Sequence, residues 1–144
     1  MSTSADTPSG RELIAAFLQH SPLSQLLGVE AVELGDDRAV LRLPFRHELT
    51  TVGDVVHGGA IGALADTAAV AAAWAFDSPP RKPAGATVSL NVDYLRAASA
   101  VDLLATGSVT HRAGRTCFCD VLVRPADEPD GAPVARATAV YRFA

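Results

Sequence analysis

The sequence contains few of the residues that several common functions require. Two cysteines, Cys117 and Cys119, are too few for a disulfide framework or a four-ligand zinc site. Basic residues number 12 against 16 acidic ones, and the net charge of −4 disfavours nucleic-acid binding, which needs a basic face. The first residues lack the basic flank and the apolar stretch of a secretory signal, so we expect a cytoplasmic protein.

Signatures of several enzyme classes are also absent. The chain has no Gly-x-Ser-x-Gly elbow, no phosphate-binding loop and no dinucleotide fingerprint, so we expect neither a metal nor a cofactor. What is present is an apolar chain of 144 residues, 49% of them hydrophobic, which suffices for one domain with its own core. We assign residues 10–144 to this single domain and residues 1–9 to a polar, disordered start.

Hydrophobic spacing predicts the order of the helices and strands. The expected elements are a helix over 10–20, strands over 26–33 and 38–43, a helix over 55–76, and strands over 87–94, 101–109, 116–124 and 134–143. In the strand over 87–94, strict alternation puts Val92 on the apolar face and Thr87 on the polar face. The two cysteines fall on one side of their strand and are interpreted as packing residues.

The helix over 55–76 is the central feature of this prediction. Nine of the sixteen residues from 60 to 75 are alanine, and Asp66 is the one formal charge in the segment. A helix that is apolar nearly all round is buried in a core, whereas a membrane span with an Asp at its middle would be costly. We therefore expect an α+β fold in which an antiparallel sheet wraps around this helix.

Gly58 and Gly59 stand where this helix begins, and Asp66 follows two turns later. A helix N-terminus presents unpaired N–H groups, and glycine lets a ligand carbonyl approach them without a Cβ in the way. A carboxylate among apolar neighbours is costly unless a cleft or a partner stabilises it. Taken separately, these residues are explained by a helix start and a structural Asp; together on one buried helix they favour a site.

Gly58 and Asp66 of one subunit cannot act on the same reacting atoms. Eight helical residues separate them by ~12 Å, whereas reacting groups must approach to about 3–3.5 Å. If both belong to one active site, they come from different subunits, as an antiparallel pairing of two such helices across a two-fold axis allows. The site hypothesis therefore predicts at least a homodimer.

Four short segments of the sequence, at residues 57–59, 64–68, 91–96 and 111–116, carry a family resemblance. Through them, and over roughly residues 26–143, the sequence resembles the PaaI-like family of hotdog-fold acyl-CoA thioesterases. The resemblance implies a hotdog fold, tetramers of the kind common in the family, and an acyl-CoA substrate. It further implies these catalytic roles: Asp66 as general base or nucleophile, the N–H of Gly58, next to Gly59, as the group that polarises the thioester carbonyl, His57 at the helix entrance, and Thr87 as a hydroxyl that orients water.

One position departs from the family pattern, and several others are candidates for contact with coenzyme A. Members commonly carry Asn six residues before the His, where this chain has Thr51, whose shorter hydroxyl would have to assist the carbonyl. Arginines near strand ends are candidates to meet the phosphates, although a solvated surface explains them equally well. The candidate substrate-binding residues are Arg96, Arg112, Gly114, Arg115 and Thr116.

Acyl-CoA hydrolysis, which releases a carboxylate and free coenzyme A, is the leading functional hypothesis. A hotdog hydratase or dehydratase on a thioester-linked chain is an alternative that would need His57 as a base. A non-catalytic acyl-CoA-binding protein is a third. Neither nucleic acid nor a membrane is expected as a partner.

Overall fold

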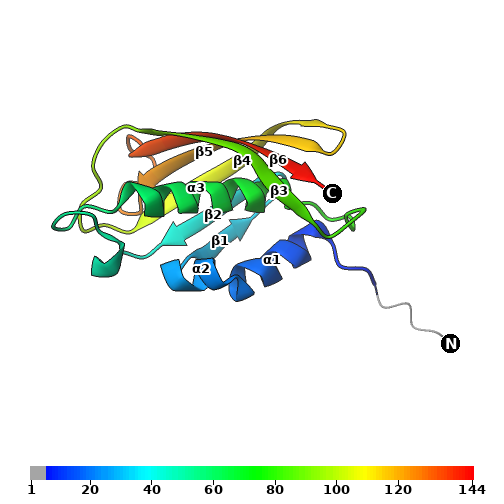
Figure 1. Cartoon of the computed structure of the whole chain (residues 1–144), viewed down its shortest axis with the longest axis horizontal. Helices are drawn as coiled ribbons and strands as arrows, with labels where there is room; N and C mark the ends of the chain where they lie inside the picture. Colours follow the sequence, from blue (N-terminus) through cyan, green and yellow to red (C-terminus); the bar gives the residue numbers. More distant parts are fainter. Residues whose placement is uncertain (1–5) are drawn as a thin grey trace.

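A six-stranded antiparallel sheet curves around helix α3 in the computed structural model, which describes residues 6–144 (Figure 1). The helices are α1 (Gly10–His20), α2 (Pro22–Leu27) and α3 (Gly58–Ala73), with a 3-10 turn at His47–Leu49. The strands are β1 (Glu30–Leu34), β2 (Arg38–Leu43), β3 (Gly85–Tyr94), β4 (Leu103–Ala113), β5 (Thr116–Pro125) and β6 (Ala135–Phe143), in the spatial order β1-β2-β4-β5-β6-β3. The predicted arrangement of a sheet around one central helix is confirmed.

Alanines on α3 let the helix lie very close to the sheet. A Cβ added at Gly107 of β4 would lie 2.4 Å from the backbone oxygen of Ala68, so the two backbones are almost in contact there. The helix is shorter than predicted because His57 already caps its N-terminus and Trp74 ends it. No helix within residues 6–144 is long and apolar enough to cross a membrane.

The segment before β1 is helical where the sequence analysis predicted a strand. Residues 22–27 form α2, so the expected strand over 26–33 is wrong in its first part, and β1 begins at Glu30. Pro22 at the first helical position is preorganised for a helix, and Gly28, at φ 78°, ends α2 with a left-handed residue. Leu27 of this helix is buried in the core. The proline at its start and the glycine at its end therefore explain why the segment is helical.

Strand β3 lies at one edge of the sheet and contains a bulge. Its pairing with β6 shifts between Thr87 and Ser89, which leaves Val88 as an extra residue that is 63% exposed. The bulge puts Thr87 opposite the buried Tyr141, on the same side as Val92. The strict alternation that assigned Thr87 to the outer face is therefore wrong, because alternation fails wherever a bulge inserts a residue.

Helix α1 closes the open side of the sheet next to β1. Its N-cap is Ser9, whose side chain accepts a hydrogen bond from the Glu12 N–H, while the Glu12 carboxylate accepts from the Ser9 N–H. Ile14 and Leu18 point into the core from this helix. Of the predicted disordered start, residues 1–5 lie outside the described part of the chain, and Ser9 takes part in this cap.

Candidate active site

The N-terminus of α3 holds one backbone donor without an internal partner. His57 satisfies three others: its Nδ1 accepts from the Gly59 N–H at 2.7 Å, and its carbonyl accepts from Ala60 and Ile61. Within residues 6–144, no acceptor meets the N–H of Gly58, which is partly exposed. Of the two predicted glycine donors, Gly58 is thus available to a ligand oxygen and Gly59 is already bonded.

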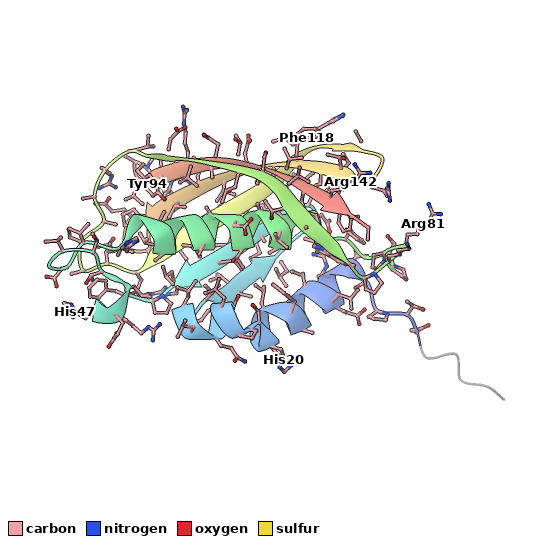
Figure 2. All side chains as sticks on the ribbon, viewed as in Figure 1. His20, His47, Arg81, Tyr94, Phe118 and Arg142 are labelled. Atoms are coloured by element: carbon pink, nitrogen blue, oxygen red, sulfur yellow. The ribbon has the colours of Figure 1, made fainter. Side chains whose placement is uncertain are left out.

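Tyr94, at the end of β3, lies against this helix start (Figure 2). Its hydroxyl donates to the Gly58 carbonyl at 2.6 Å. A Cβ at Gly58 would lie 3.3 Å from the Tyr94 ring, and one at Gly62 would lie 3.4 Å from its hydroxyl. The sequence analysis assigned no role to Tyr94, and its contact explains why the first turns of α3 carry glycine.

Asp66 and Thr87 form the polar centre of the candidate site. The Thr87 hydroxyl donates to Asp66 Oδ1 at 2.7 Å, which joins the middle of α3 to the edge strand β3. Both residues are half-buried, so the carboxylate is partly shielded from water and its second oxygen has no partner among the described residues. The bulge at Val88 makes this contact possible because it turns Thr87 towards the helix.

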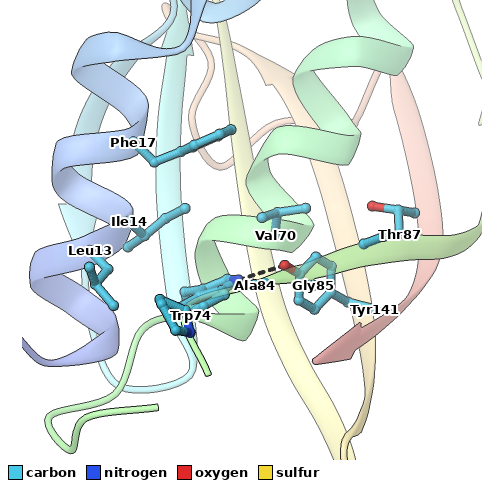
Figure 3. A pocket seen from close by; sticks show the side chains of 11 residues that line it. Leu13, Ile14, Phe17, Val70, Trp74, Ala84, Gly85, Thr87 and Tyr141 are labelled. Carbon is cyan, nitrogen blue, oxygen red and sulfur yellow. Dashed lines mark hydrogen bonds between the residues drawn. The ribbon is translucent and has the colours of Figure 1, made fainter. Parts of the chain in front are cut away.

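An apolar cavity of about 370 Å³ begins beside Thr87 and runs between α1 and β3 (Figure 3). Its floor is α3, where Val70 and Trp74 follow Asp66 at intervals of four residues and so lie on the same face of the helix. Gly58 and Gly62 precede Asp66 at the same interval, but each step of four residues turns ~40° around the helix, so Gly58 and Trp74 lie on different sides of α3. Asp66 therefore lies one turn before the cavity floor, whereas the open donor at Gly58 points away from it.

The predicted coenzyme A residues lie at two ends of the sheet. Arg96 follows the end of β3, where it bonds to Glu128 and to the Ala132 carbonyl. Arg112 bonds to Asp37 at 2.7 Å and to the C-terminal end of α3. Both arginines have internal partners that account for their positions.

The turn between β4 and β5 carries the remaining candidates for substrate contact. Gly114 has a φ of 58° there, which favours glycine, and Thr116 begins β5 with a half-buried side chain. Arg115 is exposed and forms no ion pair within the described residues. Thr51 is exposed in the loop before α3, where its N–H donates to the Val55 carbonyl.

The two cysteines are packing residues, as predicted. Cys117 and Cys119 are buried beneath α3 with their sulfur atoms 3.8 Å apart. The hydrogen bond between them, followed by burial, raises the pKa of the Cys119 thiol, and the same hydrogen bond lowers the pKa of Cys117. Cys117 is fully enclosed in the core, so neither thiol is accessible for nucleophilic chemistry. Within residues 6–144, no three His, Cys, Asp or Glu side chains gather as metal ligands.

Comparison with known proteins agrees with this fold. Residues 53–132 match the thioesterase superfamily. A Halobacterium salinarum protein, provisionally named an esterase, is 33% identical over 135 residues, which are 91% of this chain and 89% of that protein.

Two solved structures share the fold. A mutant of the phenylacetic acid degradation protein PaaI from Thermus thermophilus is 26% identical, with a TM-score of 0.72 over 85% of this chain and 100% of that one. A provisionally named esterase from Mycobacterium tuberculosis is 27% identical, with a TM-score of 0.73 over 85% and 96% of the two chains. The chain therefore belongs to the thioesterase superfamily, with the hotdog fold and the PaaI-like relatives that its motifs indicated, and its class is that of the thioester hydrolases.

Proposed function

We propose that this protein is an acyl-CoA thioesterase that hydrolyses its substrate to a carboxylate and free coenzyme A. The observation that carries the proposal is the Asp66–Thr87 pair at the mouth of an apolar cavity. A polar reaction centre next to an apolar pocket suits a thioester, which has a polar reacting group joined to an apolar acyl chain. Membership of the thioesterase superfamily supports the same reaction class.

Asp66 acts as the general base in this proposal. One carboxylate oxygen is held by Thr87, and the other accepts a proton from a water molecule as the water oxygen bonds to the carbonyl carbon. The negative charge that develops on the carbonyl oxygen is stabilised by the Gly58 N–H at the positive end of α3. The carbon–sulfur bond then breaks, and the proton held by Asp66 passes to the departing thiolate.

The site is completed by a second copy of the chain. Within one subunit, Gly58 and Asp66 remain ~12 Å apart along α3. Strand β3 is an edge strand with exposed apolar side chains, including Val88, Leu90 and Tyr94. The unpaired backbone groups of such an edge favour pairing with a strand of another chain. Antiparallel pairing of two β3 strands brings Asp66 of one subunit towards Gly58 of the partner; a tetramer would join two such dimers.

Coenzyme A meets the exposed turn between β4 and β5. Arg115 is the candidate there, because it is exposed and forms no ion pair among the described residues, whereas Arg112 and Arg96 already have internal partners. Gly114 and Thr116 shape this turn rather than supplying charge.

The cytoplasm, where acyl-CoA is made and used, is the proposed location.

One observation disfavours the hydratase alternative. His57 would have to act as a base, but its Nδ1 accepts the Gly59 N–H and caps α3. In the neutral side chain the proton therefore resides on Nε2, so neither ring nitrogen is free to accept a proton while this cap is in place. His57 thus fits the role of orienting the helix entrance.

A panel of acyl-CoA thioesters, assayed by release of free thiol, tests the proposed reaction. We expect Asp66→Asn to lose at least about 100-fold in kcat, since an amide cannot accept the proton. Asp130→Asn, which changes an exposed carboxylate in a distant turn, is the matched control and should keep full activity. Full turnover by a folded Asp66→Asn protein would refute the mechanism.

A further inference from the structure

The cavity beside Thr87 has the lining and size of an acyl pocket. None of its eleven lining residues carries a charged side chain, and Thr87 both lines it and bonds to Asp66. We propose that it holds the acyl chain and selects unsubstituted apolar chains of medium length, with an upper limit of about ten to twelve carbons. This inference rests on the proposed thioesterase function and adds the class of its substrate.

Two independent measures give this limit. A cavity of about 370 Å³, at ~30 Å³ for each water-sized atom, has room for about twelve non-hydrogen atoms. Trp74, which lines the far part of the floor, lies eight helical residues beyond Asp66, or ~12 Å along α3. At ~1.2 Å for each bond of an extended chain, this distance corresponds to about ten bonds.

The far end of the cavity is rigid. The Trp74 indole N–H donates to the Tyr141 hydroxyl at 2.9 Å, and both side chains are buried. Phe143 packs on Trp74 with ring centroids 4.9 Å apart, which supports the wall from behind. A longer chain cannot displace this wall without breaking the hydrogen bond and the aromatic packing, so chains that reach it lose further contact with the cavity.

Helix α1 forms the adjustable side of the cavity. Leu13, Ile14 and Phe17 face β3 across it, and Phe17 is 49% exposed at the rim. Phe17 is not part of the rigid wall, so the fold does not depend on its side chain. The size of this side chain sets how much of a bound acyl chain is shielded from water. We assign Phe17 as a specificity-determining residue.

The lining also excludes charged acyl groups. A terminal carboxylate at the end of an eight-carbon chain would enter a wall of apolar side chains with no basic residue, and its desolvation would be uncompensated. An eight-carbon acyl-CoA and its analogue with a terminal carboxylate have nearly the same length. This pair of substrates therefore separates selection by charge from selection by length.

Hydrolysis of straight-chain acyl-CoA substrates of four to sixteen carbons tests the proposal. We expect kcat/KM to rise about four-fold for each added methylene up to about ten carbons, then to fall beyond twelve. The eight-carbon chain should exceed its carboxylate analogue by at least about 100-fold. A flat chain-length profile, or equal rates for the matched pair, would overturn the proposal.

Variants at Phe17 test the assigned determinant. Phe17→Ala should lower about five-fold the ratio of kcat/KM for the ten-carbon acyl-CoA to kcat/KM for the four-carbon acyl-CoA. The reason is that the apolar contact of half an aromatic side chain with the longer chain is lost. Leu26→Ala is the matched control, since Leu26 is an exposed apolar residue of α2 outside the cavity. An unchanged ratio in Phe17→Ala would remove Phe17 from this role.

Binding can be measured without catalysis because Trp74 is the one tryptophan of the chain. Titration with 1-decanol should change its fluorescence saturably, whereas 1-butanol at the same concentration should not. If decanol binds but no acyl-CoA is hydrolysed, the acyl pocket stands and the proposed hydrolysis fails. If acyl-CoA is hydrolysed but decanol leaves Trp74 unchanged, hydrolysis stands and the assignment of the pocket fails.

Discussion

Replacing Thr87 by valine isolates the contact that holds Asp66. Valine has the same shape and suits a strand, but it removes the hydroxyl that donates to Asp66 Oδ1 at 2.7 Å. A hydrogen bond to a charged acceptor contributes about 1.5–3 kcal/mol, so a carboxylate that has lost its orientation should slow kcat by about 10- to 150-fold. Thr87→Ser keeps the hydroxyl and should stay within a few-fold of the wild type.

The assay is thiol release from the best acyl-CoA of the panel, with kcat and KM measured separately. We expect the loss in kcat, because the hydroxyl positions the base and does not hold the acyl chain. The Tm of Thr87→Val should stay within about 2 °C of the wild type, since Thr87 lies on an edge strand and is only half-buried. Full kcat in the valine variant, at normal Tm, would refute the role of this contact.

Three further predictions concern stability and binding. Gly107→Ala should lower the Tm by roughly 3–10 °C, because its Cβ would meet the Ala68 oxygen at 2.4 Å and push α3 from the sheet; an unchanged Tm in calorimetry would contradict this close approach. A hydrogen bond from the Phe45 N–H, and next in importance one from the Arg42 side chain, hold the pKa of Asp102 below its ordinary value. Ionised Asp102 therefore stabilises the fold above that value, and this stabilisation is lost as the pH falls below it. Asp102→Asn should therefore lower the Tm at pH 7, with the difference closing below the ordinary value of 3.8; a constant difference down to acid pH would disprove it. Arg115→Glu should raise KM for acyl-CoA but leave KM for the same acyl group on N-acetylcysteamine unchanged, and equal changes on both would exclude phosphate contact.

Much of the architecture could be predicted from hydrophobic periodicity and alanine content. The alanines of α3, the alternation in β5 and β6, and the glycines before Asp66 are local signals, and each is found where it was expected. The error at residues 26–29 also has a local cause, because Ser21, Pro22 and Gly28 together mark a short helix that apolar spacing alone does not reveal.

The rest of the site depends on contacts between distant segments. No glycine or other turn residue in the sequence marks the bulge at Val88, yet Thr87 faces Asp66 because of this bulge. The internal partners of Arg112 come from the turn after β1 and the end of α3, which no spacing along the chain relates. The cavity needs α1 opposite β3, and this pairing follows from how the sheet closes around α3.

The most direct test of the shared active site is the activity of a purified hybrid dimer. One subunit carries Asp66→Asn, and the other carries Gly58→Val, whose side chain would enter the space next to the Tyr94 ring. Each parent dimer should be nearly inactive, whereas the hybrid contains one site with an intact Asp66 and an intact partner Gly58. The account predicts about half of the wild-type kcat per dimer for the hybrid. A hybrid that is no more active than its two parents would contradict a site built from two subunits.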